Sequence, residues 1–248
     1  MNESFFRFYA SLNDFLRKEH RQQRFAYRYE ACQTVKHLIE AAGVPHTQVA
    51  LIRIDGRSVA FESRVPDASC VDVYPCFLQL DIRECSRVLP PRLPVHRFVN
   101  DVHLGKLAAY MRLLGLDVVY RNEFEDEKLV EISITENRIL LTRDRALLKR
   151  KGIVYGYYLR SMQPQEQLAD VFTRYRLDGE VRLYSRCPRC NGLLQKVEKA
   201  EILSRLEPKT KRYYHAFKIC PSCKNIYWKG SHHERINRMM VRFLGCIK

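Results

Sequence analysis

Residues 97–120 read RFVNDVHLGKLAAYMRLLGLDVVY, and this stretch decides the fold of the middle of the chain. Its apolar start, Phe98-Val99, runs into Asp101, and an apolar stripe at helical spacing then extends to Gly115. Another short apolar run, Val118-Val119-Tyr120, follows at once. A strand, a helix and a second strand in this order indicate part of a parallel sheet whose faces are covered by helices.

The same alternation of strands and helices continues to about residue 177. It predicts further strands over 139–141 and 154–159, and further helices over 126–136, 145–151 and 164–175. Functional groups of parallel α/β sheets lie beyond the carboxyl ends of the strands. Asp101 and Asp144 both fall at such ends.

Residues 1–83 have a different pattern, typical of a small α+β domain. After an apolar strand at the start, a helix is predicted between Thr34, as its N-cap, and Gly43, which ends it. Two apolar runs flank Asp55-Gly56, a strong signal for a β-hairpin, and residues 71–74 form a last strand. We therefore predict a β-grasp sheet.

The N-terminal motifs resemble the ubiquitin-like sulfur-carrier proteins of thiamine and molybdopterin synthesis. The resemblance rests on TVKHLI at 34–39, GVP at 43–45, Asp55-Gly56 and VDVYP at 71–75. Those carriers act through a free C-terminal Gly-Gly, which this segment lacks, so we expect no sulfur transfer. What remains is a scaffold role, or a docking site for a protein partner.

Two pairs of cysteines in the last quarter of the chain have the spacing of zinc knuckles. They are Cys187-Pro-Arg-Cys190 and Cys220-Pro-Ser-Cys223, separated by 29 residues. Four thiolates suit tetrahedral Zn²⁺, and the two-residue gap lets both sulfurs of a knuckle face one ion. Free buried thiols and redox pairs are the alternatives. We predict a structural zinc ribbon with four cysteine ligands, in which full sulfur ligation leaves no position for chemistry.

Positive charge is concentrated in the same part of the chain. The whole sequence has a net charge of +15, and residues 182–248, with 16 Lys and Arg against 4 Asp and Glu, carry +12 of it. Such a segment either binds a polyanion or is a solvated face that keeps the protein soluble. Basic and aromatic side chains alternate here, as on surfaces that bind unpaired bases. Five of them are predicted to bind substrate: Arg189, Lys211, Arg212, Trp228 and His232.

Three aspartates are candidates for a catalytic metal site. Asp101 and Asp144 follow strands, and Asp126 opens the helix before the second of these strands. A nuclease needs carboxylates that hold Mg²⁺ or Mn²⁺, because the metal activates water and stabilises charge on the phosphoryl group. Each aspartate also precedes a helical run, however, where Asp is an ordinary N-cap.

The central motifs closely resemble the Mut-seven C-terminal RNase domain, a family similar to PIN-type nucleases that carries the same zinc ribbon. The resemblance rests on FVNDVHLGKLA at 98–108, RLLGLD at 112–117, RILLTRD at 138–144 and YWKGSH at 227–232. The N-terminal domain is similar to the ubiquitin-like partner often fused to this family. The likeness therefore covers nearly the whole chain.

This resemblance implies metal-dependent cleavage of single-stranded nucleic acid by an acidic cluster. It assigns the catalytic and metal-binding roles to Asp101, Asp126 and Asp144. Glu123, Glu125 and Glu127 compete for the middle position, and Asp117 is a possible fourth acid. Lys106 and Arg143 would contact substrate phosphate, or else are solvent-facing charges.

We expect a multidomain chain of α+β and α/β parts: a β-grasp domain (1–83), a stiff proline-rich linker (84–96), a PIN-like parallel sheet (97–181) and a zinc ribbon with a basic tail (182–248). The expected function is a Mg²⁺- or Mn²⁺-dependent ribonuclease whose ribbon, held by Zn²⁺, binds RNA. A non-catalytic RNA-binding adaptor and a DNA-directed nuclease are the alternatives. With no apolar span of membrane length and no secretory leader pattern, we expect a cytoplasmic protein.

Overall fold

The computed structural model describes residues 1–230 and 245. Contacts within the chain divide it into two compact units. The first joins residues 1–95 with 125–159, and the second joins 96–124 with the chain from residue 160 onward. No helix of the described residues is long and apolar enough to cross a membrane.

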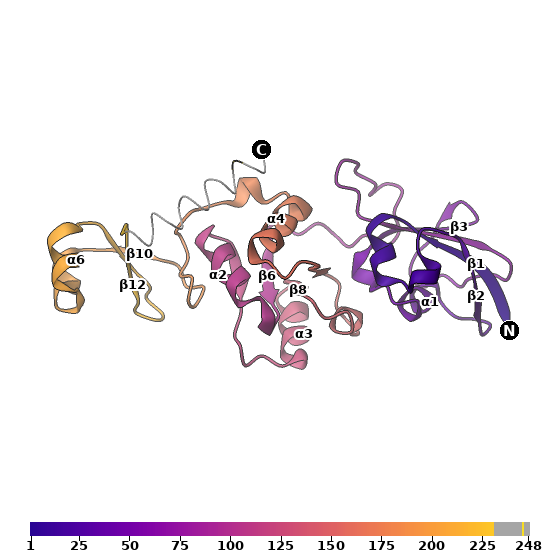
Figure 1. Ribbon diagram of the computed structural model, residues 1–248, viewed down its shortest axis with the longest axis horizontal. Helices are drawn as coiled ribbons and strands as arrows, with labels where there is room; N and C mark the ends of the chain where they lie inside the picture. The colour runs from indigo at the N-terminus through magenta and orange to yellow at the C-terminus, as the bar shows by residue number, and fades with distance from the viewer. Residues whose placement is uncertain (231–244, 246–248) are drawn as a thin grey trace. The chain divides into compact units, whose positions relative to one another are not determined.

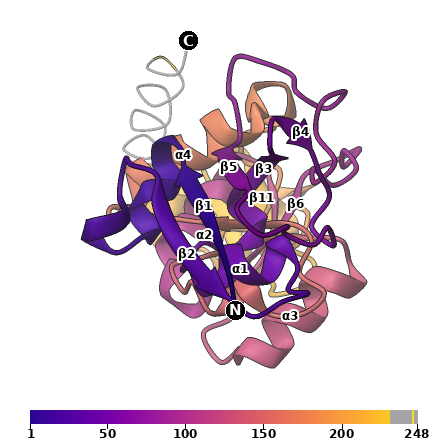
Figure 2. The same ribbon diagram turned by 90° about the vertical axis from the view of Figure 1, so that its right-hand side faces the viewer.

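The first unit contains a mixed five-stranded sheet. Its strands are β1 (Asn2–Phe8), β2 (Phe25–Tyr29), β3 (Val49–Ile54), β4 (Arg57–Ser58) and β5 (Cys70–Pro75), with one helix, α1 (Val35–Ala41). The strand order is β2-β1-β5-β3-β4, with β1 and β5 parallel and the other pairs antiparallel (Figure 2). Short 3-10 helices η1 (Ala10–Phe15), η2 (Lys18–His20) and η3 (His46–Gln48) connect the elements. The predicted β-grasp sheet is confirmed.

Buried and exposed side chains alternate along β1, and its buried side chains are part of the core of this sheet. Phe6 and Phe8 are buried and lie on the side opposite to Phe5, which is exposed. Burial of each phenylalanine contributes about 1.5–3 kcal/mol. Val88, from the segment predicted as a linker, is buried in the same core. The sequence analysis did not predict β2, which pairs with β1 at the edge of the sheet.

The structure confirms the predicted N-cap of α1 and the predicted β-hairpin. The Thr34 hydroxyl oxygen accepts a hydrogen bond from the His37 N–H at 3.3 Å and caps α1. After the helix, Gly43 has a φ of +108°, and a Cβ there would lie 2.8 Å from the carbonyl oxygen of Phe15. Asp55 and Gly56 both have positive φ, as a tight hairpin between β3 and β4 requires.

The remaining elements of the first unit are α3 (Asp126–Thr135), β8 (Ile139–Thr142), η5 (Leu147–Lys149) and β9 (Gly156–Tyr158). β8 and β9 are parallel, and every residue of β8 is buried. A strand buried on both faces explains the continuous apolar run in the sequence.

The second unit holds the strands β6 (Arg97–Asn100) and β7 (Asp117–Val119), which are also parallel. Its helices are η4 (Val102–Leu104), α2 (Gly105–Leu113), α4 (Pro164–Tyr175) and η6 (Leu177–Glu180), and α2 packs against α4 (Figure 1). The central sheet has the order β7-β6-β8-β9. The prediction of a parallel sheet with helices is confirmed.

A three-stranded antiparallel ribbon completes the second unit. It consists of β10 (Gln195–Val197), β11 (Phe217–Ile219) and β12 (Ile226–Trp228), in this order, with the helices α5 (Lys199–Ile202), η7 (Leu203–Arg205) and α6 (Pro208–Tyr213) between β10 and β11. Its buried core consists of Ile202, Leu206 and Phe217. So small a core is a weak source of stability for a separate domain.

Candidate metal centre and acidic residues

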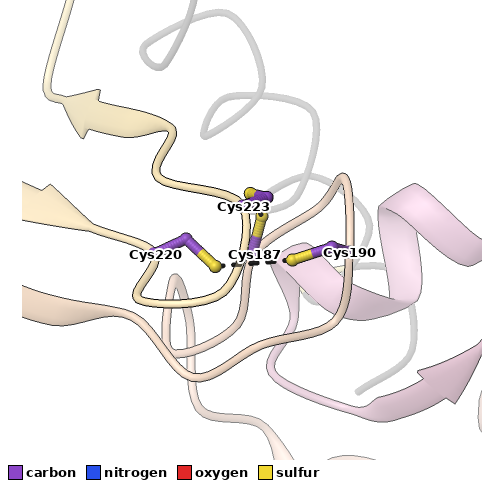
Figure 3. A group of neighbouring side chains, drawn as sticks. All are labelled: Cys187, Cys190, Cys220 and Cys223. Carbon is purple, nitrogen blue, oxygen red and sulfur yellow. Dashed lines mark hydrogen bonds between the residues drawn. The ribbon is translucent and has the colours of Figure 1, made fainter.

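The four cysteines of the two knuckles converge on one point. All four sulfurs lie within 4.8 Å of one another, and the distances are 3.5 Å between Cys187 Sγ and Cys223 Sγ and 3.4 Å between Cys190 Sγ and Cys220 Sγ (Figure 3). Zn–S bonds of about 2.3 Å in a tetrahedron would hold the sulfurs about 3.8 Å apart. The donor set and its spacing therefore fit a structural zinc ion.

The two knuckles have the same backbone conformation. Asn191 and Lys224, each directly after the second cysteine of a knuckle, have φ values of +72° and +61°. In both knuckles the N–H of the first cysteine donates to a carbonyl five residues ahead, Cys187 to Gly192 at 2.8 Å and Cys220 to Asn225 at 2.9 Å. The chain thus turns back tightly enough to aim both sulfurs inward.

The pKa values of two of the four thiols are shifted in opposite directions. Burial raises the pKa of the Cys190 thiol to about 12. Burial also opposes ionisation of Cys223, but hydrogen bonds, led by the Asn225 backbone N–H, lower its pKa to about 7. Tyr227, whose hydroxyl lies 3.0 Å from Cys187 Sγ, has a raised pKa because of its burial. Zinc requires thiolates, so its binding must release the remaining protons.

A buried arginine joins the first knuckle to the α/β part of the second unit. Arg112, on α2, is 3% exposed. Its guanidinium donates to four carbonyl oxygens, those of Val118 (2.9 Å), Tyr120 (3.3 Å), Pro188 (3.1 Å) and Arg189 (3.0 Å). Burial lowers the pKa of Arg112, although nearby Cys187 and Cys190 oppose this shift. The planar fork of arginine suits several carbonyls at once.

Asp117, a possible fourth acid, also contacts the first knuckle. Its Oδ1 accepts from Asn191 Nδ2 at 2.8 Å and its Oδ2 lies 3.2 Å from Arg186 Nη2. Asn191 Oδ1 in turn accepts the Val118 N–H at 3.1 Å. These contacts give Asp117 a role in holding the knuckle against β7.

The three candidate catalytic aspartates differ in their local surroundings. Asp101 is 6% exposed and occupies the N-cap position of η4, yet its side chain makes no capping hydrogen bond. Asp126 is the first residue of α3, one position after the cap, and its Oδ2 lies 3.7 Å from Arg150 Nη2. Asp144 is exposed and its Oδ1 accepts the Ala146 N–H at 2.7 Å. The Asp144 bond lies in the turn before η5, whose N-cap position is Ala146.

Among residues 1–230 and 245, the four cysteines are the one group of three or more potential metal ligands with donor atoms this close together. Of the glutamates that compete for the middle position, Glu127 pairs with Arg150 at 3.1 Å and Glu123 with Arg121 at 3.7 Å.

Asn100 is a polar residue of interest that the sequence analysis missed. It ends β6 directly before Asp101 and is completely buried, and neither its amide nitrogen nor its amide oxygen has a hydrogen-bond partner among the described residues. Unsatisfied buried amides are rare and often mark functional sites. The signal in the sequence was an Asn directly after the apolar pair Phe98-Val99.

The predicted substrate-binding residues are mostly accessible. Lys106, Arg189 and Arg212 are exposed, and Lys211 and Arg143 are half-buried. Nε of Arg143 has no hydrogen-bond partner within the part of the chain that the structure describes. His232 lies outside the described residues.

Aromatic side chains on the ribbon accompany these charges. Tyr213 is 64% exposed, and the guanidinium of Arg212 lies 5.6 Å from its ring centroid. Trp228 is 36% exposed and tilted against Tyr214 and Phe217, with ring centroids 6.3 Å away in both cases. Part of the Trp228 ring thus remains accessible, although its other contacts are with the ribbon itself.

Comparison with known protein families yields two matches. The model of the Mut7-C RNAse domain matches residues 96–240, and the model of the Mut7-C ubiquitin domain matches residues 1–81. Neither the curated proteins nor the solved structures gave a match. The two matched segments agree with the boundary between the N-terminal sheet and the central strands.

Proposed function

This chain belongs to the family of the Mut7-C RNAse domain, and from that premise we propose that it is a Mg²⁺- or Mn²⁺-dependent ribonuclease that hydrolyses phosphodiester bonds of RNA. Family membership itself supports a nuclease-type function. The metal dependence, the RNA substrate and the residues that carry out the reaction are our proposal. The cytoplasm is the proposed compartment, since zinc-binding thiolates must stay reduced.

The observation that carries the proposal is the position of two of the aspartates at the ends of strands. Asp101 directly follows β6, is 6% exposed and does not cap η4. Asp144 lies two residues after β8. Carboxyl ends of parallel strands are the usual place for an active site.

Carboxylate oxygens at Asp101, Asp126 and Asp144 would hold the divalent ion. When bound, such an ion activates water and stabilises the charge on the phosphoryl group. Asp101 and Asp144 would fix the ion beside the scissile phosphate. The hydroxyl oxygen of Thr142 accepts the Asp144 N–H at 2.8 Å and restrains that residue. Arg143 would contact a phosphate oxygen.

Single substitutions of the aspartates test the proposal. We expect Asp101→Asn and Asp144→Asn each to lower Mn²⁺-dependent cleavage of labelled single-stranded RNA at least about 100-fold, because a neutral amide binds the ion poorly. Asp178→Asn, at an exposed aspartate of η6, is the matched control and should retain activity. Loss of cleavage in Asp126→Asn but not in Glu125→Gln would identify Asp126 as the middle acid.

Unchanged RNA binding in the two inactive variants would complete the evidence. Cleavage that persists in both variants contradicts the proposed site. Binding without cleavage by the wild-type chain would favour the adaptor, and equal cleavage of matched DNA would favour the DNA-directed nuclease, since only RNA offers the 2′-hydroxyl.

The exposed basic and aromatic side chains of the ribbon support its role in binding the RNA strand. We expect Arg212→Gln to weaken binding and to reduce the slope of log affinity against log salt by about 0.7, the value for one single-strand phosphate contact. Trp228 is the one tryptophan of the sequence, so stacking of a base on it should quench the fluorescence of the chain. Arg57→Gln, at an exposed arginine of β4, should change neither quantity. An unchanged slope of log affinity against log salt in Arg212→Gln would contradict the role of the ribbon in binding RNA.

A further inference from the structure

The N-terminal domain is packed against residues 145–158 of the same unit. Gln48, at the end of η3, forms hydrogen bonds with the backbone of Gly156 and of Tyr158 in β9. Its Nε2 donates to the Gly156 carbonyl oxygen at 3.2 Å, and its Oε1 accepts the Tyr158 N–H at 3.4 Å. A side-chain amide thus takes the place of a neighbouring strand and satisfies the edge of β9.

A second set of contacts involves the end of α1 and the start of η3. Lys149 Nζ donates to the Glu40 carbonyl oxygen at 2.6 Å, and His46 Nε2 lies 2.7 Å from the Ile153 carbonyl oxygen. His46 Nδ1 lies 2.6 Å from the Glu40 carboxylate. Because a carbonyl oxygen can only accept, Nε2 of this buried imidazole donates to Ile153. Burial alone would raise the pKa of Glu40, but the hydrogen bond from His46 lowers it.

The third set of contacts surrounds Arg145. Its guanidinium lies 4.9 Å from the ring centroid of Phe15 and 5.5 Å from that of Tyr158, and these two rings meet edge to face. It also donates to the carbonyl oxygens of Phe15 (3.3 Å) and Asp14 (3.2 Å). Gly43 permits this arrangement, because a side chain there would collide with the Phe15 carbonyl.

Arg145 directly follows Asp144 in a short turn after β8. The Asp144 N–H donates to the Thr142 hydroxyl oxygen at 2.8 Å, and Asp144 Oδ1 accepts the Ala146 N–H at 2.7 Å. Both hydrogen bonds depend on the backbone position of residues 144–146. Within this turn, the side chain of Arg145 reaches the N-terminal domain.

We propose that the N-terminal domain positions the turn that carries Asp144, with Arg145 as the positioning residue through which it acts. Phe15 and the carbonyls of η1 hold the Arg145 side chain, and this fixes the carboxylate one residue earlier. One face of the ubiquitin-like domain is then occupied by the chain's own nuclease segment. The catalytic consequence rests on the proposed function, but the structural consequence does not.

Substitution of Arg145 tests both consequences in the full chain. In the absence of RNA and added Mn²⁺, Arg145→Gln should speed hydrogen exchange of the Ala146 amide by about 10-fold or more, because the turn opens more often. In the cleavage assay, the Mn²⁺ concentration for half-maximal activity should rise about 10-fold, as for loss of an outer contact to a metal ligand, while KM for RNA stays the same. Lys151→Gln, an exposed residue of the same segment, is the matched control.

Arg145→Lys keeps a cation near the rings but loses the planar fork, so it should restore part of both quantities. Phe15→Leu removes the ring from the other side and should reproduce the effect of Arg145→Gln. Unchanged exchange at Ala146 in both Arg145→Gln and Phe15→Leu would overturn the positioning role. Faster exchange in a chain that never cleaves RNA would instead leave the positioning role standing and refute the ribonuclease.

Discussion

Removal of zinc is expected to unfold the ribbon while the N-terminal sheet stays folded. The hydrophobic core of the ribbon has three buried residues, Ile202, Leu206 and Phe217. Metal binding, in contrast, contributes about 10–16 kcal/mol of apparent free energy in zinc-finger peptides. The sheet of β1 to β5 has its own large core, which does not involve the cysteines. The two parts should therefore respond differently to a chelator.

Trp228 provides the measurement, because it is the one tryptophan of the sequence and lies on β12. Chelation should shift its fluorescence emission to longer wavelength, and zinc should reverse the shift. Cys187→Ser and Cys220→Ser should show the shifted emission without chelator. Cys32→Ser, at an exposed cysteine outside the knuckles, should behave as the wild type. A ribbon that keeps its emission after complete zinc removal would contradict a structural role for the metal.

Replacement of Arg112 should have the second largest effect on stability. Arg112→Leu would remove one buried and three part-buried hydrogen bonds, those to the carbonyl oxygens of Val118, Tyr120, Pro188 and Arg189. Stranding several such acceptors costs about 3–5 kcal/mol in the free energy of unfolding. Because two of these carbonyls lie inside the first knuckle, the same substitution should also loosen the zinc site.

Urea unfolding followed by Trp228 fluorescence measures this effect as a lower midpoint. Arg112→Lys should recover only part of the loss, since one ammonium group cannot reach both β7 and the knuckle. Arg121→Met is the control, because that side chain is 69% exposed and its ion pair with Glu123 is 3.7 Å long. Exposed pairs contribute at most about 1 kcal/mol. Equal midpoints for Arg112→Leu and Arg121→Met would show that the guanidinium does not anchor the knuckle.

Arg112 and Arg145 illustrate where sequence-based prediction ends. Arg112 opens the RLLGLD motif, but nothing in the sequence indicates what its guanidinium binds, and Arg145 lies in none of the motifs. Their partners lie far along the sequence: Arg112 meets residue 189 and Arg145 meets residue 14. The same holds for Gln48, whose amide completes the edge of β9. Such contacts depend on how distant segments meet, and no local periodicity encodes that.

The candidate catalytic residues were predicted in part from the sequence. Strand ends located Asp101 and Asp144, but the sequence alone did not distinguish a helix cap from a metal ligand. In the structure Asp101 is buried and does not cap η4, and Asp144 accepts a hydrogen bond within its own turn. The unsatisfied amide of Asn100 was recognisable only once its neighbours were known.

By itself, the sequence determined the order of the domains, the four cysteines that converge on one point, the cap at Thr34 and the hairpin at Asp55-Gly56. These features follow from short spacings and local backbone preferences, which act within a few residues. Only the tertiary structure decided which carbonyls Arg112 binds, and that the N-terminal domain holds Arg145. Contacts of this kind form between surfaces assembled from remote segments, so their energetics exist only in the folded chain.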